Sequence, residues 1–279
     1  MALSAHATTG ERIWYYVFRV LVAVVFIYLV FPILTIIPLS FNSGEFLHYP
    51  LQGFSLRWYQ DVIASGQWAV AVKNSLIVGV SSMILATVLG TTAAVGINRV
   101  NFPGKELLVA LLISPMMIPL VISALALYLF FAKIGLNDTY LGIILAHTIL
   151  GIPFVLITVS ATLQGFDYSL MNAGASLGAA PLPVFFRIVM PLIMPGIVSG
   201  AMFAFATSLD EVVVVLFIAG PAHRTLPLQM FSGIREHLSP TILAVATMLI
   251  FFAGLLMLTL EFLRKRNEKL NAPANIAAH

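Results

Sequence analysis

Long apolar runs dominate the chain, and short polar stretches separate them. Six of these runs are long enough to cross a bilayer, which takes about 20 apolar residues. The pattern therefore predicts an all-α, polytopic membrane protein with six transmembrane helices. The approximate bounds of the runs are 13–40, 70–98, 107–133, 139–163, 192–219 and 241–263.

Two of the runs carry helix-breaking residues near their middles. Pro115 and Pro119 interrupt the third run, and Gly151 and Pro153 interrupt the fourth. Proline removes a backbone donor and bends a helix, which frees carbonyl groups on one face. In a membrane, such freed backbone is tolerated where it is buried or where it meets a wet cavity. The breaks therefore fit either a transport path or ordinary kinks that improve packing.

Small side chains recur at every fourth position in the second and fifth runs. Residues at this spacing share one helix face, and small ones let two backbones approach closely in lipid. We expect these stripes to pack within the chain, and the alternative is contact with a second subunit. The stripes are Ser82, Ala86, Gly90 and Ala94 in the second run and Gly196, Gly200, Ala204 and Ser208 in the fifth.

Composition agrees with lipid as the main solvent. Hydrophobic residues make up 60% of the 279 residues and charged residues 9%, with a mean hydropathy of +1.02, whereas soluble domains average about 25% charged residues. The sequence has no cysteine, which excludes disulfides, cysteine-based zinc sites and thiol catalysis. The net charge of +3 is small and the basic residues are scattered, so the sequence does not predict nucleic-acid binding.

The basic residues predict which side of the membrane each connection faces. Cytoplasmic loops carry an excess of Lys and Arg, and this excess arises when both termini are cytoplasmic. We therefore expect cytoplasmic tails at 1–11 and 267–279, a transmembrane domain at 12–266, and a cytoplasmic connection at 164–191. The nine basic residues then inside are Arg12, Arg19, Arg99, Lys105, Arg187, Arg264, Lys265, Arg266 and Lys269, and the five outside are Arg57, Lys73, Lys133, Arg224 and Arg235.

The cytoplasmic connection contains an apolar segment that cannot form one continuous helix. Residues 172–196 carry four prolines, and Pro181 and Pro183 interrupt any helix there. The pattern predicts a short helix near 168–177, ended by Gly178, and a second short element before the fifth span. We interpret the segment as a docking site for a partner protein, because its first helix should expose three residues of almost no bulk. These are Ala173, Gly174 and Ala175.

This segment resembles the cytoplasmic signature of permease subunits of bacterial ABC importers. That signature reads Glu-Ala-Ala, three residues, Gly, nine residues, then Ile-x-Leu-Pro, and its spacing is intact in this chain. Three letters differ, because the chain has Asn in place of Glu, Gly in place of the second Ala and Met in place of Leu. The resemblance implies that the residues coupled to a partner ATPase are Asn172, Ala173, Gly174, Ala175, Gly178, Ile188 and Pro191.

The resemblance extends over most of the chain. Ser40–Asn42, Gly53–Tyr59 and Asn74–Gly79 are similar to the same family, and Ser208–Leu249 most resembles the second permease of spermidine/putrescine-type importers. It implies the type I ABC importer (MetI-like) permease fold in the bacterial inner (plasma) membrane. It also implies alternating access and three kinds of partner: a second homologous permease, two cytoplasmic ATP-binding subunits and a periplasmic or external solute-binding protein.

The sequence lacks an ATP-binding loop. Such a loop needs spaced glycines followed by Lys and then Ser or Thr, but the only Gly-Lys pair, Gly104–Lys105, is followed by Glu106. An intramembrane enzyme is also not indicated, because neither an H-E-x-x-H nor a G-x-S-x-G motif occurs. We therefore expect a non-catalytic subunit without cofactor or metal, to which energy comes from partner ATPases.

Two adjacent carboxylates, Asp210 and Glu211, lie in the fifth apolar run. An aspartate at the centre of a membrane helix costs about 2.5–3.5 kcal/mol on insertion scales, so such residues usually face a bundle interior or a wet cavity. Neighbouring helix positions point about 100° apart, so the two carboxylates need not share a role. We expect them to line the path of a cationic solute, and the alternative is a structural pair held by a basic residue.

The sequence thus predicts the permease subunit of an ATP-driven importer that moves a polyamine, such as spermidine or putrescine, or a related cation. The alternative is a secondary transporter driven by an ion gradient, with Asp210, Glu211 or His147 as its ion site. His147 lies in the fourth run, where a hydrogen-bonded packing role is the simpler interpretation because membrane helices bury such residues with partners.

Overall fold

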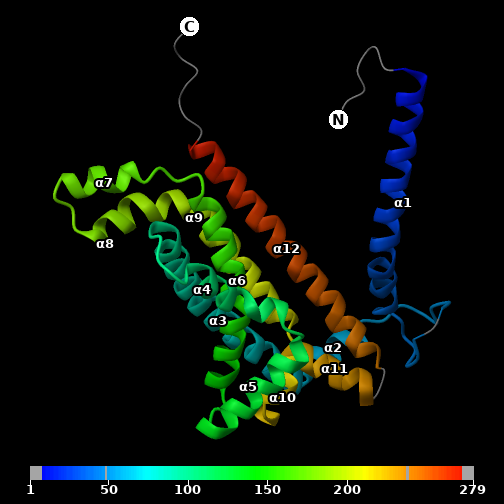
Figure 1. Cartoon of the computed structure of the whole chain (residues 1–279). Helices are drawn as coiled ribbons and strands as arrows, with labels where there is room; N and C mark the ends of the chain where they lie inside the picture. Colours follow the sequence, from blue (N-terminus) through cyan, green and yellow to red (C-terminus); the bar gives the residue numbers. More distant parts are fainter. Residues whose placement is uncertain (1–7, 48, 237–238, 272–279) are drawn as a thin grey trace. The chain divides into compact units, whose positions relative to one another are not determined.

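The computed structural model describes residues 8–47, 49–236 and 239–271. Regular structure within these residues is helical (Figure 1), which confirms the predicted all-α class. The chain divides into two compact units, one formed by 1–65 with 233–279 and the other by 66–232. The predicted tails, 1–11 and 267–279, fall mostly outside the described residues.

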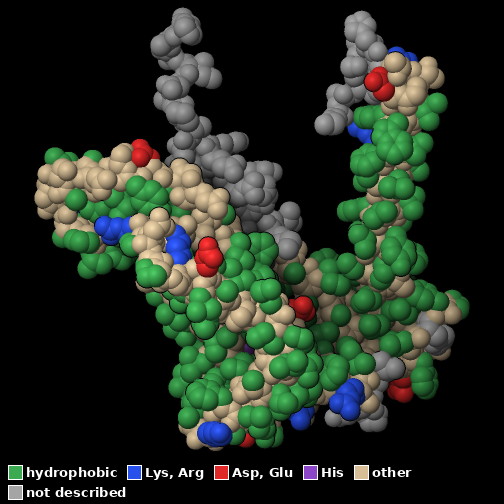
Figure 2. Space-filling model, viewed as in Figure 1, with side chains coloured by type: hydrophobic (Ala, Val, Ile, Leu, Met, Phe, Trp, Pro, Cys, Tyr) green, Lys and Arg blue, Asp and Glu red, His purple; other side chains and the backbone are tan. Residues whose placement is uncertain are grey.

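Helix α1 (Thr9–Leu39) opens the first unit. A capping box fixes its start, because the Thr8 backbone N–H donates to Glu11 Oε2 at 2.8 Å and the Glu11 N–H donates to Thr8 Oγ1 at 3.4 Å. None of its residues is buried, and hydrophobic side chains cover its visible surface (Figure 2). An apolar helix that is exposed along its whole length is typical of a lipid-facing span.

The connection after α1 folds back on itself through Asn42, which is fully buried. Its Oδ1 accepts from the Gln52 N–H at 3.0 Å, and its carbonyl accepts from the Trp58 indole N–H at 2.6 Å. Trp58 belongs to the short helix α2 (Arg57–Ala64), which packs on α12 (Pro240–Asn271) in the same unit. The stretches around Asn42 and Trp58 therefore hold each other in place.

Three helices form the core of the second unit: α3 (Gly66–Arg99), α6 (Tyr140–Leu163) and α9 (Met190–Asp210). A Cβ at Gly151 of α6 would lie 3.1 Å from both Ala86 of α3 and Ala204 of α9. The three backbones thus approach closely on the small residues, as lipid-embedded packing favours. All eight residues of the two predicted stripes are buried, which confirms packing within the chain.

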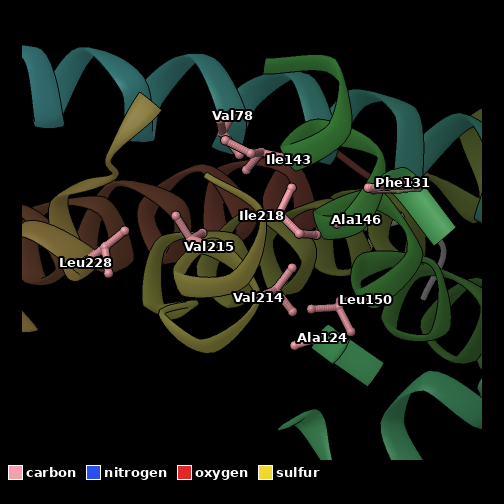
Figure 3. Close-up of a cluster of buried hydrophobic side chains, with 10 residues drawn as sticks. All are labelled: Val78, Ala124, Phe131, Ile143, Ala146, Leu150, Val214, Val215, Ile218 and Leu228. Atoms are coloured by element: carbon pink, nitrogen blue, oxygen red, sulfur yellow. The ribbon is translucent and has the colours of Figure 1, made fainter. Parts of the chain in front are cut away.

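The third predicted span is bent by 105° between α4 (Lys105–Met117) and α5 (Leu120–Ile134). The break falls at Ile118 and Pro119, both of which have extended ψ angles of 133° and 126°. Helix α5 packs on α10 (Val213–Ile218), a short helix that follows α9. Buried side chains of both helices belong to the cluster drawn in Figure 3, in which Ala124 lies with Val214 and Val215.

The predicted number of six spans is only partly tested by the described residues. Four helices among them are long and apolar enough to cross a membrane, or five if α4 and α5 together form one bent span. The sixth predicted span, 241–263, lies in α12, whose searched apolar part is Pro240–Leu255. The count of six therefore stays a prediction.

The N-terminal part of α3 binds a loop that follows α10. The Asn74 side-chain amide donates to the carbonyls of Ala222 and Arg224 at 3.0 and 2.9 Å, and its Oδ1 accepts from Tyr140 Oη at 2.6 Å. Ser75 Oγ accepts from the Leu226 N–H at 2.8 Å. Two neighbouring polar residues of α3 therefore fix the loop between η2 (Pro221–His223) and α11 (Leu226–Glu236).

Candidate coupling segment and solute recess

The connection between α6 and α9 forms two short elements, as predicted. Helix α7 (Ser169–Ser176) is followed by α8 (Pro181–Val184), and a π-helical turn, η1 (Phe185–Val189), continues from α8 into α9. Gly178 ends the first element with φ +81°, a left-handed conformation that favours glycine. In Figure 1 the two elements form a hairpin beside the start of α9. We call residues 164–191 the coupling segment.

Gly174 has a different role from the one expected of it. The sequence led us to expect Ala173, Gly174 and Ala175 all to be exposed, but Gly174 is buried. A Cβ there would lie 3.0 Å from Ile188 Cδ1 and 3.2 Å from Val184 Cγ2. The absence of a side chain at Gly174 therefore lets α7 lie against α8 and η1 of its own chain, because those two elements already fill that face of the helix.

Other residues of the coupling segment remain open to solvent. Asn172, Ala173 and Ala175 are exposed on α7, and Leu177 at its end is 89% exposed. A Cβ added at Gly178 would meet no atom within 4 Å. The end of α7 around Leu177 and Gly178 thus projects away from the rest of its unit. Of the remaining candidates, Ile188 packs under Gly174, and Pro191 is exposed in the first turn of α9.

The start of α7 is fixed by Asp167. Its carboxylate accepts from the Ser169 backbone N–H at 2.9 Å and from the Ser169 hydroxyl at 2.7 Å. These two hydrogen bonds, the hydroxyl one first, hold the pKa of Asp167 below its ordinary value, because they favour the charged carboxylate. Between these two residues lies Tyr168, whose hydroxyl donates to the Asn98 carbonyl of α3 at 3.4 Å. No local sequence pattern predicts this contact, because 70 positions separate the two residues.

The two adjacent carboxylates have separate environments. Glu211 is 6% exposed, and its Oε1 accepts from the Val214 N–H at 2.7 Å. It lies between α9 and α10 with an extended ψ of 118°, so its carboxylate caps the first turn of α10. The hydrogen-bond partner of Glu211 is thus a backbone amide and not the basic residue that the alternative interpretation supposed. Asp210, by contrast, is exposed at the last position of α9.

Asp210 lies in a recess of about 510 Å³ where two helix breaks meet. One wall carries the polar groups of Thr207 and Asp210 from the last turn of α9. The last carbonyls of a helix lack intrahelical donors, and the helix dipole makes this end negative. The recess therefore suits a cation. Its complete lining is Leu120, Ala206, Thr207, Asp210, Glu211, Val212 and Val213.

His147 is a buried packing residue in this structure, 2% exposed. Its Nδ1 and Ser208 Oγ are 2.7 Å apart, and Ser82 Oγ donates to Ser208 Oγ at 3.3 Å. One polar group from each of α6, α9 and α3 therefore meets at this point. The contact anchors the last turn of α9, two residues before Asp210.

The chain combines packed apolar helices, two broken segments and a short helical hairpin. This architecture is that of a multi-span transport permease. Residues 86–270 match the family described as binding-protein-dependent transport system inner membrane component. The chain belongs to this family of multi-pass inner-membrane proteins.

Two curated relatives match the sequence over most of their length. The spermidine/putrescine transport system permease protein PotC of Escherichia coli K12 is 32% identical over 247 residues, which cover 88% of this chain and 93% of PotC. The putrescine transport system permease protein PotI of the same organism is 35% identical over 251 residues, 88% of this chain and 89% of PotI.

A solved structure agrees with the fold. A chain of a bacterial ABC transporter involved in the import of the acidic polysaccharide alginate matches with a TM-score of 0.72, covering 94% of this chain and 99% of that chain. The two are 14% identical, so this likeness shows the fold alone. It confirms the predicted importer-permease fold.

Proposed function

We propose that this permease moves a polyamine, such as spermidine or putrescine, or a related small cation across the bacterial inner membrane. The single observation that carries the proposal is Asp210, an exposed carboxylate in a recess at the negative end of α9. The names of PotC and PotI support the same solute class. An anionic recess attracts ammonium groups and repels carboxylates and phosphates.

The recess also has the construction expected of a transport path. Leu120 follows the break between α4 and α5, and Glu211 lies at the break between α9 and α10. Discontinuous membrane helices often form solute sites, because their broken ends offer polar backbone groups inside an apolar bundle. Glu211 stabilises this arrangement as a cap, whereas Asp210 faces the solute.

Energy for transport comes from partner subunits in this proposal. Two cytoplasmic ATPases bind the exposed end of α7, a second permease completes the pathway, and an external binding protein delivers the solute. ATP binding drives alternating access because it favours one conformation of the assembly over the other. The open surface around Leu177 and Gly178 supports docking, since a partner can approach it without displacing side chains of this unit.

A matched pair of variants at Gly178 tests the docking. Any L-residue at φ +81° pays the same backbone cost, about 1–2 kcal/mol, and a Cβ there meets no atom of this chain. Gly178→Ala therefore measures the backbone cost, and Gly178→Trp adds only bulk. In the reconstituted importer we expect tryptophan, but not alanine, to lower the solute imported per ATP hydrolysed. Equal values for the two variants would contradict the docking role.

A secondary transporter is tested by the same reconstitution. We expect no uptake when the ATPase subunits are omitted, and no effect of an uncoupler when they are present. Uptake that persists without ATPases and stops with an uncoupler would overturn the proposal.

The proposed topology places both termini and the coupling segment in the cytoplasm. The chain has no cysteine, so a single introduced thiol reports its own position. We expect Leu177→Cys to react with a membrane-impermeant maleimide only in inside-out vesicles, and Lys133→Cys, exposed in the last turn of α5, only in right-side-out cells. The opposite labelling of this pair would reverse the topology.

A further inference from the structure

Of the three core helices in the second unit, α3 alone lacks a direct backbone connection to α7. Residues 164–168 join α7 to α6, and α8 with η1 joins it to α9. Helix α3 instead ends at Arg99 and leads into α4. Any movement of α7 therefore reaches α3 only through side-chain contacts.

Tyr168 supplies such a contact at the inner end of α3. It is the residue directly before α7, and its hydroxyl donates to the Asn98 carbonyl at 3.4 Å. That carbonyl belongs to the last turn of α3, where the backbone lacks intrahelical donors. The rings of Phe166 and Tyr168 pack edge to face with their centroids 5.2 Å apart, and this contact holds the tyrosine in position.

Asn98 extends the contact to α6. Its side-chain amide donates to Ala94 of its own helix at 2.8 Å and to Ser160 Oγ of α6 at 2.9 Å. One residue of α3 thus binds Tyr168 through its backbone and α6 through its side chain. The inner ends of α3 and α6 and the start of α7 are joined by this short chain of hydrogen bonds.

The outer end of the same helix holds the loop between η2 and α11. Asn74 and Ser75 bind its backbone at Ala222, Arg224 and Leu226. Asn74 and Asn98 are 24 positions apart on one helix, about 36 Å at 1.5 Å per residue. Close contacts with α6 and α9 along most of this length limit bending of α3.

We propose that α3 transmits movement between α7 and this outer loop as one rigid helix, which we call the rod. Tyr168 and Asn98 form its inner joint, the contact with α7, and Asn74 forms its outer joint, the contact with the loop. Displacement of α7 moves α3 through Tyr168, and α3 moves the loop through Asn74. The inference rests on the proposed docking of α7 to an ATPase. It adds to that function a defined route from the cytoplasmic contact to the outer face.

The test compares Tyr168→Phe and Asn74→Ala, singly and together, in the reconstituted importer. Phenylalanine keeps the ring and removes only the donor. The readout is the increase in ATPase rate caused by solute-loaded binding protein, because this signal must cross from the outer face to α7. We expect each single variant to lower the increase at least about twofold, because one lost hydrogen bond corresponds to about two- to tenfold and Asn74→Ala removes three.

The double variant decides between a rod and two unrelated effects. Two joints of one rod are coupled, so the double variant should be no worse than the more affected single variant. Tyr28→Phe on the exposed face of α1 is the matched control and should leave the increase unchanged. A double variant in which the two losses multiply would overturn the inference, as would a normal increase in Tyr168→Phe.

Failure of the rod and failure of docking give different results. If Gly178→Trp lowers the solute imported per ATP hydrolysed and Tyr168→Phe leaves the increase in ATPase rate unchanged, the docking of α7 is supported and the rod is wrong. If Gly178→Trp equals Gly178→Ala, docking itself is wrong. If Tyr168→Phe fails to assemble with the ATPases, Ser160→Ala is tested in its place, because this change removes the contact of Asn98 with α6. A normal increase in ATPase rate in Ser160→Ala then counts against the rod.

Discussion

The separate environments of Asp210 and Glu211 lead to opposite expectations for two neighbouring carboxylates. Glu211 is buried, and its Oε1 accepts from the Val214 N–H at 2.7 Å. Leaving a buried donor without its acceptor costs about 1–3 kcal/mol, so Glu211→Ala, which removes the acceptor of the Val214 N–H, should lower the free energy of unfolding by about 2 kcal/mol. Helix α10 then frays, and with it the cluster that contains Val214 and Val215.

This loss is measurable as thermal stability. A change of 1 kcal/mol shifts the melting temperature of a protein of 150–250 residues by roughly 2–4 °C, so we expect Glu211→Ala to melt roughly 4–8 °C lower in detergent. Glu211→Gln keeps an acceptor oxygen, so its loss should be less than half as large. Asp210→Asn should melt at the wild-type temperature, because its carboxylate is exposed at the last position of α9.

The KM for uptake should show the opposite pattern, with the larger change at Asp210 and the smaller one at Glu211. A unit charge about 4 Å from an ammonium group contributes roughly fivefold in affinity even when fully solvated, so Asp210→Asn should raise the KM for a diamine about five- to tenfold. Glu211→Gln should change KM by less than twofold. The reasoning is refuted if Asp210→Asn lowers the melting temperature with unchanged KM while Glu211→Gln raises KM.

Three further predictions follow from single contacts. Gly200→Ala should lower the free energy of unfolding by about 1–3 kcal/mol in a denaturation assay, because its Cβ would lie 2.7 Å from a backbone carbon of α6, whereas Gly96→Ala, with open space around it, should not. His147→Ala should lower it by about 1–3 kcal/mol, because Ser208 loses the shorter of its two side-chain hydrogen bonds. His147→Asn, which keeps a polar atom near the Nδ1 position, should recover part of this loss. The lowered pKa of Asp167 predicts that its stabilisation of α7 is fully present above pH about 4 and declines below it, because acid protonates the carboxylate. The rate at which a protease cleaves the coupling segment should therefore rise in acid in the wild type. It should change less in Asp167→Asn.

Much of the fold could be predicted because lipid imposes a strong pattern on the sequence. Apolar runs of sufficient length reveal spans, and prolines with Gly178 indicate where the cytoplasmic helices end. The 105° bend between α4 and α5 could not be derived from Pro115 and Pro119 alone. Proline frees backbone groups, but neighbouring helices decide whether a kink or a full break results.

The candidate sites were harder to predict than the spans. The spacing of the signature predicted which segment couples to an ATPase, and that stays a prediction. It could not show that Gly174 packs on Val184 and Ile188, since that requires the fold of the hairpin. Helix periodicity predicted only that the side chains of Asp210 and Glu211 point in different directions, and it did not show which of them is buried. Tyr168 and Asn98 were missed because 70 positions separate them, and no local pattern predicts a contact over that distance.

The broken third span has a consequence for how the protein is made. At 1.5 Å per residue, the 13 residues of α4 and the 15 of α5 extend about 20 and 22 Å, less than the roughly 30 Å of a hydrocarbon core. As a membrane span, residues 105–134 can therefore insert only as one stretch. Helix α5 meets its partner α10 only after some 80 more residues have been synthesised. The bend is consequently a late event of biogenesis, completed when the C-terminal half of the chain arrives.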